Sequence, residues 1–451
     1  MMRLKLMLAR TLRVLSRRLG RRGGTTLPGR VLLRIEPGAI GELGRRLERG
    51  SVVVSATNGK TTTSAMLACV LESSGARVVH NRAGSNMNWG VATALLDAGS
   101  KPGQIGLFEV DEAWLATVAR ELDPSLILLS NLFRDQLDRY GELELLADRW
   151  AELVRERDGR STFVLNADDP LVADLGRERR RVVYFGVEDR SHSLESLEHA
   201  SDSKRCRNCG HEYTYEAVYL GHLGRYRCPN CGRERPQPQV AAEQVTLRGM
   251  SGSDVRISTP QGALELSLPL PGLYNVYNAL AATAAALELG ATTGQVGAAL
   301  STFAAAFGRM ERLQVGGREL AILLVKNPAG ANEVLRTLTL EDGALDIWIA
   351  LNDGIADGRD ISWIWDADFE LLSGRVGHIS CSGTRAEEMA LRLKYAGVDA
   401  PIAVERELGA SLDAAVANGN GRPLYALPTY TALLELRDLL ADRGLARRWS
   451  D

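Results

Sequence analysis

The stretch Ser51–Ser64, which reads SVVVSATNGKTTTS, holds the residues of this chain best suited to bind phosphate. Three consecutive valines are typical of a buried strand, and a turn of small residues follows them before an apolar helical segment begins at Lys60. A tight turn into a helix presents backbone N–H groups to an anion, the lysine can reach outer phosphates, and the Thr61 hydroxyl can bind Mg²⁺. Val54 stands where a strict P-loop has glycine, so an ordinary glycine turn is the competing interpretation.

Four of the six cysteines form two C-x2-C pairs, separated by 18 residues. This is the spacing of a zinc ribbon, and a glycine after each pair lets the backbone turn tightly around the thiolates. Four thiolates close a tetrahedral Zn²⁺ site, so we expect a structural metal site, without disulfides. His211 and His222 lie in the same region and are predicted to be bystanders. The predicted zinc ligands are Cys206, Cys209, Cys228 and Cys231.

A predicted strand that starts at Gln104 ends among acidic residues, which are Glu109, Asp111 and Glu112. In an α/β sheet the carboxyl ends of the strands carry ligand-binding residues. Carboxylate oxygens are hard ligands that suit Mg²⁺. The alternative is a solvated acidic loop.

The order of the predicted elements indicates an α/β protein. Strands and helices alternate from Val52 to Phe185, which predicts a parallel sheet with right-handed crossovers. The chain has 451 residues, enough for two to four domains of roughly 100–200 residues each. We predict a basic N-terminal segment (1–48), a central P-loop domain (49–312) with the ribbon inserted at 203–236, and a C-terminal α/β domain (313–451).

Charge and hydropathy restrict where the protein acts. The net charge of −2 does not favour nucleic acid as a partner, and no apolar run is long enough to span a bilayer. Residues 1–22 are basic, with leucines at helical spacing and arginines that interrupt any signal-peptide core. This segment is interpreted equally well as a helix that contacts an anionic membrane surface or as one that packs on its own protein. We expect a cytoplasmic protein, with contact to the inner face of the membrane left open.

The sequence TNGKTTT resembles the variant phosphate loop of the Mur ligases and folylpolyglutamate synthases, and further family-like motifs follow in order. They are LFEVDE at 107–112, NLFRDQLDR at 131–139, NADDP at 166–170, GLYNVYNALAA at 272–282 and FGRMER at 307–312. In the NLFRDQLDR segment, Asn131, Asp135, Asp138 and Arg139 match the family. Gln136 replaces the family's histidine, and no lysine occurs between Lys101 and Lys204, so the usual ligands of a second metal are missing.

The resemblance to Mur ligases implies roles for single residues. It implies that Glu109 and Thr61 hold Mg²⁺, that Asn278 contacts the adenine, and that Arg309 approaches the nucleotide phosphates or ribose. It also implies that the polar loop 81–86 faces the substrate, although the loop alone is equally well a simple connection. The implied ATP-binding residues are Thr57, Asn58, Gly59, Lys60, Thr61, Thr62, Asn278 and Arg309; the implied substrate residues are Gly84 and Asn86.

Two C-terminal stretches, NDGIADGRDISWIWDADFE at 352–370 and LPTYTALLELR at 427–437, resemble the MurT family of Mur-ligase-like synthase subunits, and the likeness extends over the whole chain. The first stretch joins five aspartates to two tryptophans and a phenylalanine, a composition we expect at an interface and not in a core. Segment 326–332 lacks the aspartate and histidine that amino-acid-adding Mur ligases carry there, and begins instead with Lys326.

The MurT resemblance implies an ATP-dependent amidation. The α-carboxylate of D-glutamate in the lipid II stem peptide, or in an earlier precursor, would form an acyl phosphate that ammonia then displaces. Cys69 and Cys381 are interpreted as packing cysteines, so the ammonia would come from a separate GatD-like glutaminase subunit. A carboxylate of this chain would orient the partner's histidine, with Asp360 as the first choice and Asp357 and Asp366 as rivals.

Two other functions remain open from the sequence. A stand-alone amino-acid ligase of the Mur or folylpolyglutamate type would work without ammonia or a partner. A non-catalytic module of P-loop and zinc ribbon would bind nucleic acid or regulate, although the mixed charge of the ribbon argues against it.

Overall fold

The computed structural model describes residues 27–81, 85–99, 101, 103–134, 143–198, 201–304, 309–419 and 421–446. The predicted basic helix over residues 1–22 lies outside these ranges. Within them, no helix combines the length and the hydropathy that crossing a bilayer requires.

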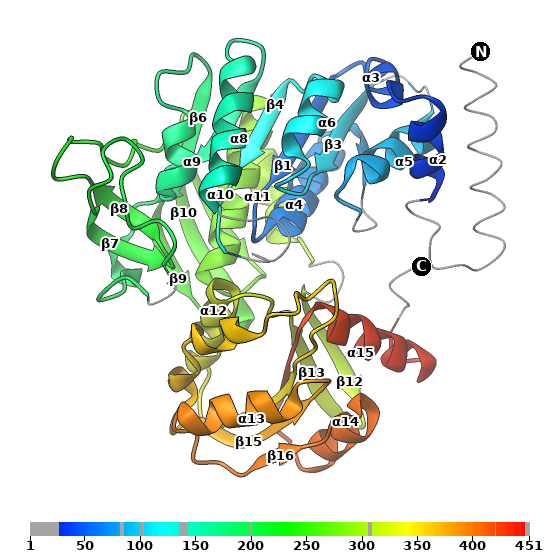
Figure 1. Ribbon diagram of the computed structural model, residues 1–451, viewed down its shortest axis with the longest axis vertical. Helices are drawn as coiled ribbons and strands as arrows, with labels where there is room; N and C mark the ends of the chain where they lie inside the picture. Colours follow the sequence, from blue (N-terminus) through cyan, green and yellow to red (C-terminus); the bar gives the residue numbers. More distant parts are fainter. Residues whose placement is uncertain are drawn as a thin grey trace.

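A nine-stranded sheet forms the first of two α/β bodies, in the order β11-β10-β9-β6-β5-β4-β1-β3-β2 (Figure 1). In this spatial order the seven strands from β9 to β2 run parallel, and β10 and β11 add an antiparallel edge. Their bounds are β1 Ser51–Ser55, β2 Arg77–His80, β3 Gln104–Glu109, β4 Leu126–Leu129, β5 Thr162–Asn166, β6 Val182–Val187, β9 Val240–Leu247, β10 Ser253–Thr259 and β11 Gly262–Leu268. The predicted parallel sheet is confirmed.

Helices cover both faces of this sheet. Side chains alternate along β1, so Val52 and Val54 enter one buried cluster and Val53 enters the other. The first cluster lies under α4 Lys60–Ser73, α10 Leu273–Glu288 and α11 Thr293–Ser301. The second lies under α2 Leu27–Ile35, α3 Ala39–Gly44, α5 Asn88–Ala98, α6 Leu115–Leu122, α8 Leu143–Glu156 and α9 Pro170–Leu175. All three valines are fully buried, as a strand covered on both faces requires.

The cysteine-rich insertion is a two-stranded antiparallel hairpin beside the sheet, built of β7 Thr214–Leu220 and β8 Leu223–Arg227 (Figure 1). One end of the hairpin carries the cysteines. Three tyrosines from the hairpin strands and the segment before them stack near these cysteines, and Ala173 of α9 packs with them.

A six-stranded sheet, in the order β12-β13-β17-β14-β15-β16, forms the second body, drawn in yellow-green to red in Figure 1. Its strands are β12 Arg309–Val315, β13 Arg318–Leu323, β14 Leu345–Ala350, β15 Val376–Ser382, β16 Ile402–Val404 and β17 Leu424–Pro428. One buried cluster lies under α12 Pro328–Thr339 and α13 Ala386–Tyr395, and another lies under α14 Leu408–Ala417 and α15 Tyr430–Asp442. All pairs are parallel except β12 with β13.

The stretch 352–370 does not lie wholly at the surface, so the expectation that its aromatic residues are unsuited to a core is wrong for Phe369. This side chain is 2% exposed, and it packs with Ile364 in the cluster shared by α12 and α13. Two short 3₁₀ turns, Ser362–Trp365 and Phe369–Leu372, bring these apolar residues inward. Trp365 is 51% exposed and stays at the surface.

Replacing a core leucine of the central strand β4 should destabilise the nine-stranded body. We expect Leu128→Ala to lower the free energy of unfolding by about 2–5 kcal/mol, because the side chain is fully buried and its loss leaves a cavity. The matched control is Leu145→Ala on α8, where the leucine is 52% exposed, with an expected change within about 0.5 kcal/mol. Urea denaturation followed by circular dichroism measures both, and equal midpoints would contradict the assigned core.

Candidate functional site

The carboxyl ends of β1, β3 and β4 meet at one edge of the nine-stranded sheet. The register pairs Val54 with Glu109 and Ser55 with Leu129. The turn between β1 and α4, residues 56–59, which is called the phosphate loop below, therefore lies beside the acidic end of β3 and beside Asn131. Thr57 N donates to the Asn131 carbonyl at 3.1 Å. This is the edge at which α/β sheets bind ligands.

Gly59 precedes the first turn of α4 with φ of 82°, in the left-handed region that favours glycine. A Cβ atom here would lie 2.1 Å from Oδ1 of Asn278, so the position also has no room for a side chain. The same Asn278 oxygen accepts from the Thr63 hydroxyl at 3.1 Å, and its amide donates to Asn275 at 3.1 Å. The asparagine predicted to contact adenine is therefore packed directly against the phosphate loop.

Lys60 is buried among acids. Its Nζ donates to the Ala56 carbonyl and to Glu112 Oε2, both at 2.9 Å. Burial opposes the lysine charge, but attraction to Glu112, Asp111 and Glu109 outweighs it and raises the pKa of Lys60. Burial likewise opposes ionisation of Glu112, yet Lys60 together with Lys326 lowers the pKa of its carboxyl. The site thus holds a charged lysine and an ionised glutamate away from bulk water.

Thr61 and Glu109 place two oxygen ligands side by side. The threonine hydroxyl donates to Glu109 Oε1 at 2.9 Å, and Glu109 is 5% exposed. The Asn81 side chain fixes the end of β3 by accepting from Glu109 N at 2.9 Å and donating to its carbonyl at 2.8 Å. A hydroxyl and a carboxylate at a phosphate loop are a donor set that fits Mg²⁺.

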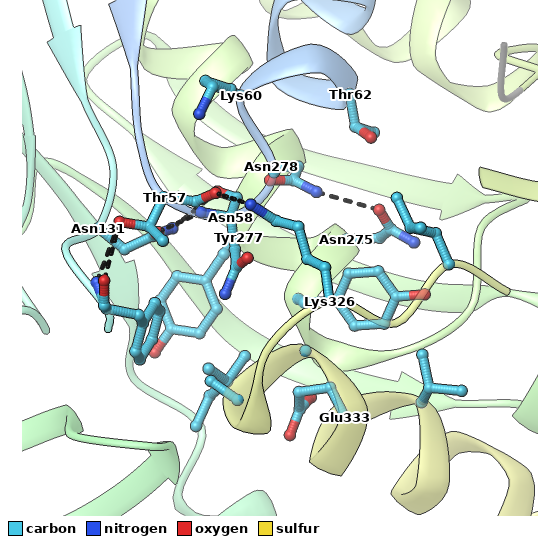
Figure 2. A pocket seen from close by; sticks show the side chains of 18 of the residues that line it. Thr57, Asn58, Lys60, Thr62, Asn131, Asn275, Tyr277, Asn278, Lys326 and Glu333 are labelled. Atoms are coloured by element: carbon cyan, nitrogen blue, oxygen red, sulfur yellow. Dashed lines mark hydrogen bonds between the residues drawn. The ribbon is translucent and has the colours of Figure 1, made fainter. Parts of the chain in front are cut away.

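The second body contributes to the same site through the segment that follows β13. Lys326 Nζ donates to the Thr57 carbonyl at 3.1 Å, and the Asn327 amide donates to Asn58 Oδ1 at 3.0 Å. Figure 2 shows Lys326 reaching across the cavity toward Thr57 and Asn58. Lys326 is therefore a second cation beside the phosphate loop.

A cavity that is open to solvent at its mouth lies between the two bodies, with lining residues from both. One part of its wall is polar and comes from the phosphate loop, Asn131 and Lys326; the other is apolar. The apolar wall includes Leu220, Leu223, Leu270, Tyr274, Tyr277 and Met310. A polar end and an apolar end suit a nucleotide.

The four cysteines come together as predicted. Their sulfur atoms all lie within 4.8 Å of one another, with 3.7 Å between Cys206 and Cys231 and 3.4 Å between Cys209 and Cys228. Tetrahedral zinc with bonds of about 2.3 Å separates sulfurs by about 3.8 Å, so the cluster fits Zn²⁺. The glycines after each pair have positive φ, 73° at position 210 and 74° at position 232.

The two histidines of the insertion are not part of the cysteine cluster. His211 lies at the exposed end of the ribbon, where its Nδ1 is 3.1 Å from the Glu212 carbonyl oxygen. His222 is fully buried at the opposite end of the hairpin, beside Asp169.

Several predicted residues lie at or near the site. Thr62 lines the cavity beside the phosphate loop, and Asn86 accepts from Asp111 N at 2.8 Å through its carbonyl. Gly84 and the matched residues Asp135, Asp138 and Arg139 lie outside the described residues, and only the backbone of Arg309 is described, in β12. The assignment of each residue to ATP, metal or substrate remains a prediction.

Sequence reasoning missed the part played by Lys326, by Asn327 and by the hairpin tip with Leu220 and Leu223. Lys326 was available as a signal, because it begins segment 326–332, which was singled out from the sequence. The hairpin tip carried no such signal, since two leucines beside a turn are typical of ordinary packing.

Asp360, Asp357 and Asp366 differ in their surroundings. Asp360 is exposed, and its carboxylate accepts from Ser362 N at 2.8 Å, a hydrogen bond that lowers its pKa. Asp357 is buried, which raises its pKa, and both of its oxygens bond Thr431 at the start of α15. Asp366 lies 3.8 Å from the Arg134 guanidinium.

Comparison with known proteins relates both bodies to one group. Residues 54–232 match the family described as Mur ligase middle domain, and residues 324–433 match the family described as MurT ligase C-terminal. The lipid II isoglutaminyl synthase (glutamine-hydrolyzing) subunit MurT of Staphylococcus aureus (strain N315) is 34% identical over 434 residues, which cover 96% of each chain.

Solved structures share the fold. A pseudomurein peptide ligase type C from Methanothermus fervidus superimposes with a TM-score of 0.70 at 23% identity, over 89% of this chain and 80% of that one. MurF ligase from Thermotoga maritima in complex with ADP gives a TM-score of 0.63 at 13% identity, over 91% and 84% of the two chains.

Removing one cysteine should empty the ribbon of metal. We expect Cys231→Ser to lower the zinc content of the purified protein from about one ion per chain to a small fraction, because three thiolates leave the tetrahedral site open. Elemental analysis measures the content. Cys69→Ser, a change at a cysteine of α4 outside the cluster, is the control and should retain the zinc. Equal zinc in both variants would contradict the site.

Proposed function

This chain belongs to the MurT family of Mur-ligase-type subunits, and on that premise we propose that it is the ATP-dependent subunit that amidates the α-carboxylate of D-glutamate in the lipid II stem peptide. The observation that carries the proposal is the 34% identity to a lipid II isoglutaminyl synthase subunit, which extends over 96% of both chains. The product of the reaction is D-isoglutamine.

The first step transfers the γ-phosphoryl group of ATP to the substrate carboxylate. A carboxylate oxygen attacks the γ-phosphorus, and the bond between this phosphorus and the bridging oxygen of the β-phosphate breaks. ADP is released, and the substrate becomes an acyl phosphate. Lys60 and Lys326 would balance the charge on the phosphates, while Thr61 and Glu109 would hold Mg²⁺, which would supply further positive charge there. Little covalent chemistry is asked of the protein, so positioning and electrostatics supply most of the rate. The MurF ligase of the same fold, solved in complex with ADP, supports a nucleotide as a ligand of this fold.

In the second step ammonia attacks the acyl carbon, phosphate leaves, and the nitrogen loses a proton. Ammonia needs no carboxylate-binding or side-chain pocket. The absence of the usual aspartate and histidine from segment 326–332 is consistent with so small a nucleophile. Lys326, which begins that segment, instead reaches the phosphate loop.

The ammonia would come from a separate glutaminase subunit of the GatD type, as the words "glutamine-hydrolyzing" in the name of the relative imply. Cys381 is a poor candidate for a glutaminase nucleophile in this chain, because it is fully buried and burial raises the pKa of its thiol to about 12.

The exposed side of stretch 352–370 is the proposed partner surface. Asp360 is exposed, and Ile355 and Trp365 on either side of it in sequence are 75% and 51% exposed. Trp365 packs edge-on against Tyr395, which is 72% exposed, while the buried Arg392 lies over the Trp365 ring and supports it from below. Exposed aromatic residues are what interfaces favour. Asp360 would orient the histidine of the partner's Cys-His pair.

The basic residues of segment 1–22 would supply attraction to anionic lipids, which suits a lipid-linked acceptor. The location we propose is the cytoplasmic face of the membrane.

The role of Lys60 is the direct test of this function. We expect Lys60→Ala to reduce amidation at least about 100-fold, because a cation that faces the transferring phosphoryl group is lost. The assay reconstitutes the chain with its glutaminase, lipid II, glutamine and ATP, and follows D-isoglutamine by mass spectrometry. Lys101→Ala, the same change at an exposed lysine, is the control. Full activity of Lys60→Ala would refute the proposal, and turnover of an amino acid without glutaminase or ammonia would favour a stand-alone ligase.

The three aspartates can be separated by the source of nitrogen. We expect Asp360→Ala to lose glutamine-dependent amidation by at least about tenfold while amidation from added ammonium salt is retained, because only the partner's reaction needs this carboxylate. Asp366→Ala is the matched control and should retain both activities.

Asp357→Ala should instead lower the unfolding temperature, since the change breaks the bonds to Thr431. Loss of only the glutamine-dependent activity in Asp366→Ala would assign the role to that residue in place of Asp360.

A further inference from the structure

The turn of the zinc-ribbon hairpin is buried against the ligand-binding edge of the sheet. Residues 221 and 222 join β7 to β8, and His222 is fully buried. On either side of this turn, Leu220 and Leu223 line the cavity described above. The end of the insertion opposite the cysteines is therefore part of the wall of the candidate nucleotide site.

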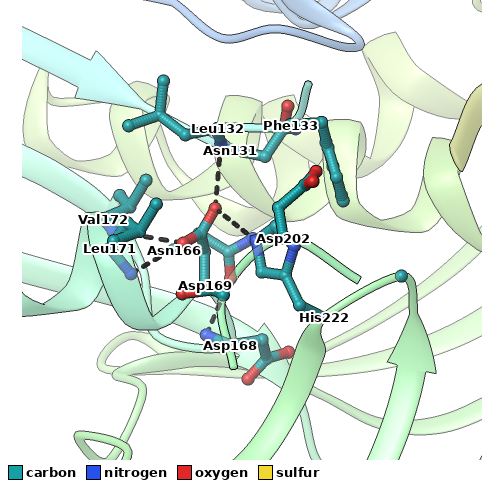
Figure 3. Close-up of polar contacts among 12 residues, drawn as sticks. Asn131, Leu132, Phe133, Asn166, Asp168, Asp169, Leu171, Val172, Asp202 and His222 are labelled. Atoms are coloured by element: carbon teal, nitrogen blue, oxygen red, sulfur yellow. Dashed lines mark hydrogen bonds and ion pairs between the residues drawn. The ribbon is translucent and has the colours of Figure 1, made fainter. Parts of the chain in front are cut away.

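The hairpin tip holds one short segment, residues 132–134, which follows Asn131. His222 Nε2 lies 3.3 Å from Asp169 Oδ2, and the same oxygen accepts from Leu132 N at 2.9 Å. Figure 3 shows Asp169 between Leu132 and His222. The imidazole ring also packs on Phe133, with 4.7 Å between ring centroids.

Gly221 of the hairpin turn and Asp202, which directly precedes the insertion, add to this contact. A Cβ atom on Gly221 would come within 2.8 Å of the Phe133 ring, so the turn lies close against it. Asp202 accepts from Arg134 N at 2.8 Å and pairs with the Arg134 guanidinium. Leu132 and Phe133 are thus held by the hairpin turn or by Asp169, which His222 contacts, and Arg134 is held by the residue that precedes the insertion.

The opposite side of the same segment holds the phosphate loop. Phe133 N donates to Thr57 Oγ1 at 3.1 Å. Asn58 N donates to Asn131 Oδ1 at 2.9 Å, and the Asn131 amide donates back to the Asn58 carbonyl at 3.0 Å. Segment 131–134 is therefore enclosed between the hairpin tip and the loop predicted to bind phosphate.

The His222–Asp169 pair has the properties of a fixed contact. Both side chains are fully buried, and Asp169 also caps α9 by accepting from Leu171 N and Val172 N. Burial opposes the histidine charge, but attraction to Asp169 and Asp202 outweighs it and raises the pKa of His222. A buried acid–base pair is sensitive to the loss of either partner.

We propose that the tip of the zinc-ribbon hairpin contributes to nucleotide binding. In this proposal His222 is a positioning residue: it holds segment 131–134 in place and, through this segment, positions Thr57 and Asn58. The inference rests on the proposed ATP-dependent function. It assigns to the insertion a role in nucleotide affinity, beyond the structural role expected of a zinc ribbon.

The test measures ADP binding to the full-length chain by isothermal titration calorimetry. We expect His222→Leu to raise the Kd for ADP about tenfold, and His222→Gln, whose amide can donate to Asp169, to recover part of the affinity. Tyr226→Phe is the matched control on the same hairpin and should bind as the parent does. The Tyr226 hydroxyl is buried with no hydrogen-bonding partner among the described residues.

Steady-state kinetics separate positioning from general loss of structure. A positioning role predicts a higher KM for ATP with a similar rate at saturating ATP, whereas partial unfolding lowers the rate in proportion to the folded fraction. If His222→Leu does not fold, Gly221→Ala, which pushes on Phe133 from the insertion, takes its place with the same expected loss.

ADP affinity equal to that of the parent, in a His222→Leu chain that unfolds at the parent's temperature, would overturn the inference alone. Absence of ADP binding by the parent itself would refute the proposed function together with the inference.

Discussion

The buried charge of Lys60 is the constraint on which the rest of the site depends. The lysine lies among Glu109, Asp111 and Glu112, each less than 10% exposed. Burial of ions is costly unless each is paired, and Glu112 pairs with Lys60 at 2.9 Å. The acids outnumber the lysine, so a polyphosphate would meet net negative charge here unless further cations joined it. Lys326 and a Mg²⁺ held by Thr61 and Glu109 would supply that charge.

This charge balance explains why the site needs both bodies. Lys326 belongs to the six-stranded body, yet it bonds the Thr57 carbonyl and lowers the pKa of Glu112. The second body therefore contributes positive charge beside the phosphate loop and also forms part of the cavity wall. The segment after β13 carries a lysine that faces the phosphate loop.

How much of this could be predicted from sequence depended on whether the signal was local. The strand predicted to start at Gln104 does start there, as β3, and the cysteine spacing predicted the four-cysteine cluster, because both patterns are set by neighbours in the chain. The burial of Phe369 was missed because composition does not reveal how two 3₁₀ turns direct a side chain. The contact of Lys326 with Thr57 joins residues 269 positions apart, and no periodicity in the chain encodes such a pairing.

The insertion carries the four-cysteine cluster at one end and part of the cavity wall at the other. Two strands bury too little apolar surface to be stable alone, so their order must come from elsewhere. At one end four thiolates can fix the chain around zinc, and at the other His222 fixes it against Asp169. Between these ends the tyrosines 213, 215 and 226 pack against one another. A hairpin that is anchored at both ends is stiff. A stiff wall is required to hold segment 131–134 against the phosphate loop.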